Sequence, residues 1–119
     1  METSDAVDGL GALAHSGRLN AFRLLVQAGA EGLPAGEIAA RIGMPPSSLS
    51  TNLNILARAG LVRSRRESRS IIYTADYEAM RTLLAFLMED CCAGAPEICA
   101  PLVEVLNRSA CCTDPSLQA

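Results

Sequence analysis

The sequence contains no tryptophan, no lysine and a single histidine, and aromatic residues make up only 3% of its 119 residues. A core must therefore be built from Leu, Ile, Val, Ala and Met. The densest apolar run, Leu83–Met88, is far shorter than the roughly 20 residues that span a bilayer, so we expect no membrane partner. The opening residues, Met1–Asp5, are acidic where a secretory leader is basic, and we expect a cytoplasmic protein.

Cysteine is also absent from residues 1–90, whereas five cysteines follow between Cys91 and Cys112. Thiols stay reduced in the cytoplasm, and an odd number of them cannot all pair within one chain. We therefore interpret these cysteines as metal-binding or reactive thiols rather than as a disulfide framework.

Positive charge is scarce overall but concentrated in the middle of the chain. The net charge is −3, yet residues 41–73 hold six Arg and one Glu, which gives a local net charge of +5. Phosphates respond to such a local patch rather than to the total charge, and arginine can bind a phosphate with two parallel hydrogen bonds. The middle third of the chain is therefore the candidate nucleic-acid-binding region.

The first part of the chain predicts two helices. Apolar residues recur at helical spacing over residues 4–14 and again over residues 16–28. Ser16 is the expected cap of the second helix. His15 lies at the junction with no partner nearby in the sequence, and we expect it to be a loop or packing residue.

A helix-turn-helix is predicted next. Residues 34–42 form a third helix that begins at a proline and ends at a glycine, and residues 44–46 form a turn. A fourth helix starts at Ser47 or Ser48 and runs to about Ala59. A short helix, a tight turn that contains glycine and a second helix together form this motif.

The fourth helix is amphipathic. At about 100° per residue, Leu49, Leu53 and Leu56 fall on one side and short polar side chains on the other. The polar face is either an ordinary solvated surface or a recognition surface that reaches bases and phosphates in the major groove. The candidate DNA contacts of this helix are Ser47, Ser48, Ser50, Thr51, Asn52, Asn54 and Arg58, with Asn52 near the edge of the face.

Two strand-like runs, Leu61–Arg66 and Arg69–Thr74, predict a hairpin with a short link at Glu67-Ser68. A cationic two-stranded wing beside a recognition helix is typical of contact with phosphates or the minor groove, although a charged edge strand is the alternative. The basic residues along the hairpin and its tip are Arg63, Arg65, Arg66 and Arg69.

Two more helices are predicted after the hairpin. Asp76 can cap a helix over residues 77–92, and Pro96 opens a sixth helix. Apolar residues occupy well over half of the circumference of the fifth helix. One face can cover the core of the domain, and a second copy is the economical partner for the rest. The predicted fold is mainly α with a small β-hairpin, a winged helix-turn-helix in residues 1–108 that dimerises through its terminal helices. Residues 109–119 form a cysteine-containing tail that we expect to be mobile.

The run Ser48–Val62, with its Ala-Gly-Leu-Val ending, resembles the ArsR/SmtB metalloregulators, as do the segment Arg65–Arg69 and Tyr73. These are small dimeric winged-helix repressors that leave their operators when a metal or metalloid binds. The resemblance covers nearly the whole chain and implies a homodimer on double-stranded operator DNA with an imperfect inverted repeat. Asn52 departs from the family pattern, because many members carry His there.

The resemblance also indicates the inducer. Zinc, nickel and cobalt sensors of the family use Asp and His pairs on the fifth helix, and cadmium and lead sensors use cysteines earlier in the chain; this sequence has neither set. The remaining pattern, Cys91-Cys92 followed by Cys99, resembles the arsenic- and antimony-responsive branch. This implies As(III) or Sb(III) as the inducer and no required cofactor.

The chemistry of the three cysteines is consistent with this implication. Soft thiolates select soft ions, and trivalent arsenic is saturated by three bonds. Gly94 and Pro96 provide a bend that can return Cys99 to the vicinal pair. Zinc usually takes a fourth ligand, which Cys111 or Cys112 could supply. For this second vicinal pair, an accessory site, a delivery site and an incidental role all stay open.

Several alternatives remain open. The cysteines could be small buried residues, the thiols of an oxidation-sensing repressor, or ligands of a zinc- or cadmium-responsive repressor. An arsenate-reducing enzyme is not expected, because it needs an oxyanion cradle of the kind that an Arg at a helix start provides. Glu89, Asp90 and Glu97 instead flank these cysteines, and their charges repel an anion and disfavour the thiolate.

Overall fold

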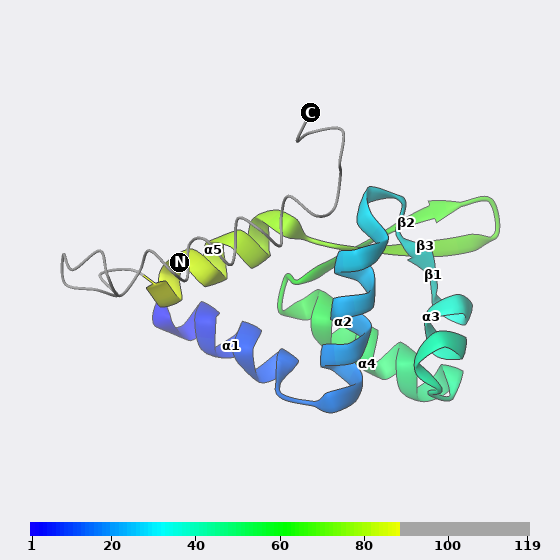
Figure 1. The fold of residues 1–119 in the computed structure, drawn as a ribbon, viewed down its shortest axis with the longest axis horizontal. Coiled ribbons are helices and arrows are strands. Elements are labelled where there is room, and N and C mark those ends of the chain that lie inside the picture. Colours follow the sequence, from blue (N-terminus) through cyan, green and yellow to red (C-terminus); the bar gives the residue numbers. More distant parts are fainter. Residues whose placement is uncertain (89–119) are drawn as a thin grey trace. The chain divides into compact units, whose positions relative to one another are not determined.

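The computed structural model describes residues 1–88, of which Met1–Phe86 form one compact unit (Figure 1). No helix of the described residues is long and apolar enough to cross a membrane. The predicted sixth helix, the domain boundary at residue 108 and all five cysteines lie outside the described residues. The elements in chain order are α1 (Thr3–Leu13), α2 (Ser16–Ala28), the 3-10 turn η1 (Gly29–Glu31), β1 (Leu33–Pro34), α3 (Ala35–Ile42), α4 (Pro46–Arg58), β2 (Val62–Glu67), β3 (Ser70–Ala75) and α5 (Tyr77–Met88).

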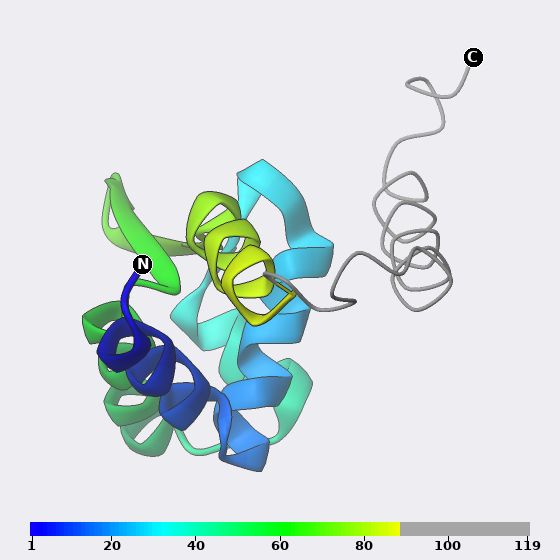
Figure 2. The same ribbon diagram turned by 90° about the vertical axis from the view of Figure 1, so that its left-hand side faces the viewer.

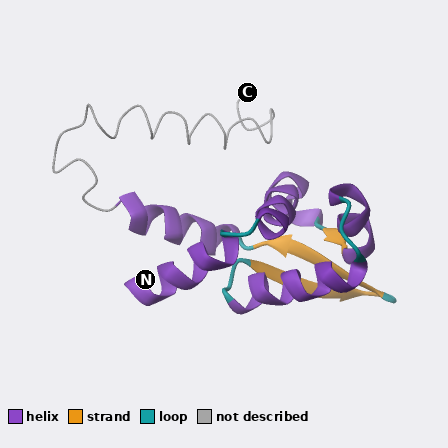
Figure 3. Ribbon diagram, turned by 90° about the horizontal axis from the view of Figure 1, so that it is seen from below, coloured by secondary structure: helices purple, strands orange, loops and turns teal. Residues whose placement is uncertain are grey.

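The core is built around the packing of α2 on α4 through their apolar faces (Figure 1). Its largest fully buried side chains come from α2, α3 and α4: Leu25, Ile38, Leu49, Leu53 and Leu56. Seen from the other directions, α1 and α5 lie at one end of the unit, and the β-hairpin extends away from them (Figures 2 and 3). The mainly helical winged helix-turn-helix architecture is therefore confirmed.

The predicted hairpin belongs to a three-stranded antiparallel sheet of order β1-β3-β2. The ladder between β2 and β3 runs from Val62 opposite Ala75 to Glu67 opposite Ser70. The third strand, β1, was not predicted, because it has only two residues, one of them a proline. Gly32 leads into it with a φ of 69°, and a Cβ there would lie 2.3 Å from the carbonyl oxygen of Tyr73. Only glycine therefore allows this close approach to β3.

The cap of α2 differs from the prediction. His15, not Ser16, is the N-cap residue, and its Nδ1 accepts hydrogen bonds from the backbone N–H groups of Gly17 at 3.1 Å and Arg18 at 3.3 Å. The imidazole nitrogen thus takes the role that a Ser, Asp or Asn oxygen usually has at this position. A search for conventional capping residues therefore misses it.

We predict that His15→Ala lowers the free energy of unfolding by about 1 kcal/mol, because two backbone donors at the start of α2 lose their acceptor. His15→Asn should retain most of the stability, since the Asn side-chain oxygen can accept the same bonds. Urea denaturation followed by circular dichroism measures both variants. Equal losses for the two substitutions would contradict a capping role.

Candidate nucleic-acid interface

The outward face of α4 is polar. Leu49, Leu53 and Leu56 are fully buried, which turns the opposite side of the helix toward solvent. Thr51 Oγ1 donates to the carbonyl oxygen of Ser47 at 3.3 Å, one turn earlier in the helix. The exposed candidate residues of α4 are Ser47, Ser48, Ser50, Thr51, Asn54 and Arg58. These short side chains and one arginine form a surface that could reach base edges and phosphates.

Asn52 does not belong to this surface. Its side chain is buried, with only 8% of the residue exposed, and it is the one buried polar residue of the described part of the chain. Its Oδ1 accepts from Arg18 Nη1 at 3.2 Å, and its Nδ2 donates to Met44 Sδ at 3.3 Å. Both halves of the amide are therefore engaged inside the protein. The structure does not bring Asn52 to the exposed face of α4, and its contact with DNA stays a prediction.

Two of the four wing arginines hold the wing in place. Arg65 donates to the carbonyl oxygens of Ala30 at 3.2 Å and Glu31 at 2.8 Å, and it pairs with Glu67 at 2.6 Å. These bonds tie β2 to η1. Arg63 Nε pairs with Asp76 Oδ2 at 2.9 Å, at the base of the wing. The guanidinium groups of both residues are thus used within the fold.

Arg66 and Arg69 differ from these two. Both are exposed near the tip of the hairpin, which turns through Ser68 at a φ of 56°. Neither makes a hydrogen bond or an ion pair with another residue of the range 1–88, and the same is true of Arg58 at the end of α4. Among the arginines of α4 and the wing, these three have whole guanidinium groups available to an external anion.

Asp76 joins the wing to α5. Its Oδ1 accepts from the N–H of Ala79 at 3.0 Å, which caps the helix as predicted, and its Oδ2 accepts from Arg63. The Ala79 hydrogen bond, and secondarily Arg63, hold the pKa of the Asp76 carboxyl below its usual value of 3.8 against the opposing effect of burial. The folded state thus binds a proton at Asp76 less readily than the unfolded chain.

We predict that Asp76→Asn is less stable than the wild type at neutral pH and that this difference shrinks as the solution is acidified. The contribution of a carboxyl with a lowered folded-state pKa is full above the unfolded value and is lost as pH falls through the folded one. Unfolding free energies from urea titrations between pH 7 and pH 3 measure it. A gap that stays constant over this range would contradict the prediction.

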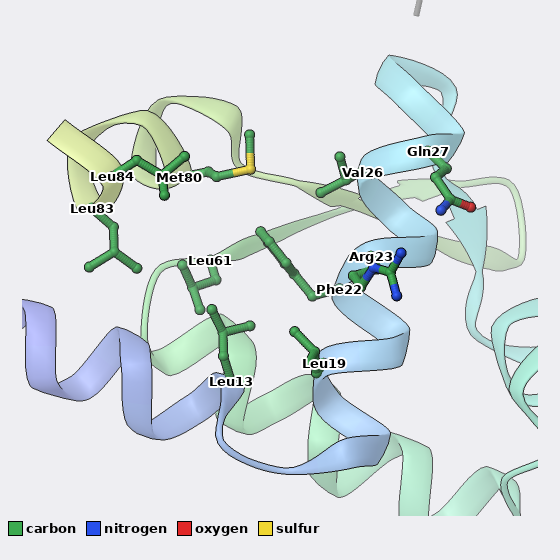
Figure 4. A pocket seen from close by; sticks show the side chains of 10 residues that line it. All are labelled: Leu13, Leu19, Phe22, Arg23, Val26, Gln27, Leu61, Met80, Leu83 and Leu84. Atoms are coloured by element: carbon green, nitrogen blue, oxygen red, sulfur yellow. The ribbon is translucent and has the colours of Figure 1, made fainter. Parts of the chain in front are cut away.

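An apolar cavity lies at the other end of the unit, between α1, α2 and α5 (Figure 4). Its volume is about 310 Å³. Exposed apolar residues of α1 and α2, Val7, Leu10 and Leu19, add to the apolar character of this end. The lining residues are Leu13, Leu19, Phe22, Arg23, Val26, Gln27, Leu61, Met80, Leu83 and Leu84.

Within residues 1–88, no cluster of three or more His, Cys, Asp or Glu side chains is placed to hold a metal ion. The predicted metalloid ligands Cys91, Cys92 and Cys99, and the accessory Cys111 and Cys112, lie outside the described residues. Their roles stay predictions.

Comparisons with known proteins agree with the helix-turn-helix geometry. Residues 13–65 match a family model described as a helix-turn-helix domain. Two uncharacterised HTH-type transcriptional regulators of Mycobacterium tuberculosis are each 35% identical over 74 residues, 61% of this chain, and the chain spans only 62% of their length. The transcriptional activator HlyU of Vibrio cholerae is 31% identical over 85 residues, which cover 71% of this chain and 76% of HlyU.

Solved structures support the same assignment. The structure of Vibrio cholerae HlyU has a TM-score of 0.60 and 33% identity, and covers 73% of this chain and 97% of that one. The homodimeric winged helix-turn-helix domain of a possible ArsR-family regulator from Mycobacterium bovis has a TM-score of 0.60, 28% identity and coverage of 71% and 77%. A possible transcriptional regulator for arsenical resistance has a TM-score of 0.59, 28% identity and coverage of 67% and 80%. The chain belongs to the winged helix-turn-helix transcriptional regulators of the ArsR/HlyU type.

Proposed function

We propose that the protein is a transcriptional repressor that binds double-stranded operator DNA as a homodimer and is released by As(III) or Sb(III). The DNA-binding part is supported by the exposed polar face of α4 and by the exposed side chains of Arg66 and Arg69, whose charges meet no carboxylate within residues 1–88. The rest of the wing is fixed by Arg63 and Arg65, so these charges are displayed at a defined place.

The mode of binding follows from this arrangement. The exposed face of α4 enters the major groove, and the wing contacts phosphates or the adjacent minor groove. Two copies related by a twofold axis place their α4 helices in successive major grooves, about 34 Å apart, and so require an imperfect inverted repeat. The apolar end of the unit around α1 and α5 supports dimerisation, and the Mycobacterium bovis relative is a homodimer.

The inducer part of the proposal rests on the cysteine pattern. Three thiolates, from Cys91, Cys92 and Cys99, satisfy the three bonds of trivalent arsenic, and Cys111 and Cys112 serve an accessory role. The structural likeness to a possible regulator for arsenical resistance supports the choice of a metalloid. HlyU is named as an activator, so the repressor role of this chain comes from the resemblance described above.

The start of α5 offers a path for the response. The Tyr77 hydroxyl donates to the carbonyl oxygen of Val26 at 2.9 Å, and the Asp76 N–H donates to that of Leu61 at 2.8 Å. These bonds fix the beginning of α5 to α2 and to Leu61, the residue directly before β2. A displacement of α5 therefore also moves α2 and the segment between α4 and β2, which support the helix-turn-helix and the wing. A coupling free energy of roughly 1–3 kcal/mol is typical for such responses, and nearly complete release needs about 5 kcal/mol.

We predict that Arg66→Ala and Arg69→Ala each weaken DNA binding at all sequences and reduce the slope of log K against log salt by about 1, because each removes a phosphate contact. Arg81→Ala is the matched control, since it removes one charge from α5, where Arg81 pairs with Glu78. Fluorescence anisotropy at several salt concentrations measures the slopes. An unchanged slope for Arg66→Ala and Arg69→Ala would exclude them as phosphate contacts.

We predict that arsenite releases the reduced wild type from its own promoter DNA and fails to release Cys99→Ser, because that variant cannot supply three thiolates. A Cys111→Ser/Cys112→Ser double variant should still be released. Anisotropy under excess reductant reports binding.

Release of Cys99→Ser by arsenite would overturn the three-thiolate site. A wild type that stays bound in arsenite but leaves the DNA with peroxide would indicate an oxidation-sensing repressor. Release by zinc or cadmium alone would instead indicate a metal-responsive one.

A further inference from the structure

Two polar side chains, those of Arg18 and Asn52, form a hydrogen-bonded pair on the buried side of α4. Asn52 of α4 is buried among leucines, and its Oδ1 accepts a hydrogen bond from Arg18 Nη1. Arg18 lies in the first turn of α2 and is partly buried itself. No carboxylate of the described residues pairs with its guanidinium group.

The second interaction of Arg18 explains how its charge is accommodated. Arg18 Nε donates to the carbonyl oxygen of Ala12 at 2.6 Å, in the last turn of α1. The final carbonyls of a helix have no partner within that helix, and they carry the negative end of its dipole. One guanidinium group therefore joins the end of α1 to the buried face of α4.

The turn of the helix-turn-helix closes this network from the other side. Asn52 Nδ2 donates to Met44 Sδ, and a Cβ at Gly17 would lie 2.4 Å from Met44 Cε. The turn before α4 thus packs directly on the first turn of α2. Asn52 is thus connected through Arg18 to the end of α1 and the start of α2, and through Met44 to the turn.

This network differs in kind from the apolar packing around it. The burial of Leu49, Leu53 and Leu56 attracts α4 to the core, but apolar attraction is non-directional and tolerates small rotations or shifts of the helix. A hydrogen bond has a narrow range of distance and angle. Within residues 1–88, the two bonds of Asn52 are the only side-chain hydrogen bonds that join α4 to another segment.

We propose that Arg18 and Asn52 are positioning residues that fix the rotation and register of α4 and so determine how its exposed face meets the bases. This inference rests on the proposed DNA-binding function. Neither residue touches DNA in this arrangement. They influence DNA binding through the exposed side chains of α4, whose positions relative to the base edges change when the helix rotates or shifts.

A role in stability alone makes a different prediction. Removing one partner leaves the other buried without its hydrogen bond, which destabilises the fold, whereas replacing both partners with apolar groups of similar shape can be nearly neutral. The double variant Arg18→Met/Asn52→Leu therefore separates the two roles. The double variant should be more stable than Asn52→Leu alone, but it lacks the directional hydrogen bond between residues 18 and 52.

The first experiment measures binding of the full-length wild type and variants to operator and to unrelated DNA by anisotropy. The temperature is chosen so that circular dichroism shows every variant folded. The double variant should lose about tenfold in the ratio of specific to non-specific affinity, comparable to one mismatched base pair. Its salt slope should not change, because no phosphate contact is removed. A double variant whose ratio of specific to non-specific affinity equals that of the wild type would overturn the proposal.

Control variants separate geometry from charge and packing. Arg18→Lys keeps the charge but cannot bridge Ala12 and Asn52 with a planar fork, and it should also lose specificity. It serves as the test variant if the double variant does not fold. Arg23→Met removes a charge from an exposed position of α2 that makes no hydrogen bond to α4. This control should retain most of the wild-type ratio of specific to non-specific affinity.

The second experiment does not depend on DNA. Nuclear Overhauser contacts between the side chains of α4 and those of α2 and α3 report the rotation and register of α4 in the free protein. In the double variant, the pattern of these contacts should differ from that of the wild type. An unchanged pattern would overturn the proposal even if the wild type binds no DNA, whereas absent wild-type DNA binding alone would overturn only the proposed function.

Discussion

The burial of one face of α4 is the interaction on which the rest of the structure depends. Leu49, Leu53 and Leu56 are fully buried, and each such side chain contributes roughly 1.5–3 kcal/mol to folding. Because the leucines recur at helical spacing, their burial decides which side chains of α4 face outward. The direction in which the candidate DNA-reading surface faces is therefore a direct consequence of core formation.

Five arginines of the helix-turn-helix and the wing show two different uses of the guanidinium group. Arg18, Arg63 and Arg65 use their guanidinium groups within the fold, where they join segments that are distant in the sequence. Arg66 and Arg69 instead display charge at the tip of the wing. The same residue type thus builds the frame and supplies the charged contact surface, and sequence position alone does not distinguish the two uses.

The sequence predicts the helices and the hairpin well because their signals are local. Apolar spacing, Gly43 after α3 and Asp76 before α5 are all read within a few residues. The missed features depend on distant partners. The strand β1 exists because Leu33 pairs with Tyr73, and Asn52, at the edge of the predicted polar face, is drawn inward by Arg18 and Met44. The thiol site lies outside the described residues and stays a sequence prediction.

The absence of lysine has a consequence for how this surface can be controlled. Acetylation neutralises lysine and is a common way of weakening contacts with nucleic acid, but it has no target in this wing. Arginine also stays protonated at any physiological pH. Lysine acetylation therefore cannot switch off this surface, and the proposed inducer has to act by changing where the wing and α4 lie.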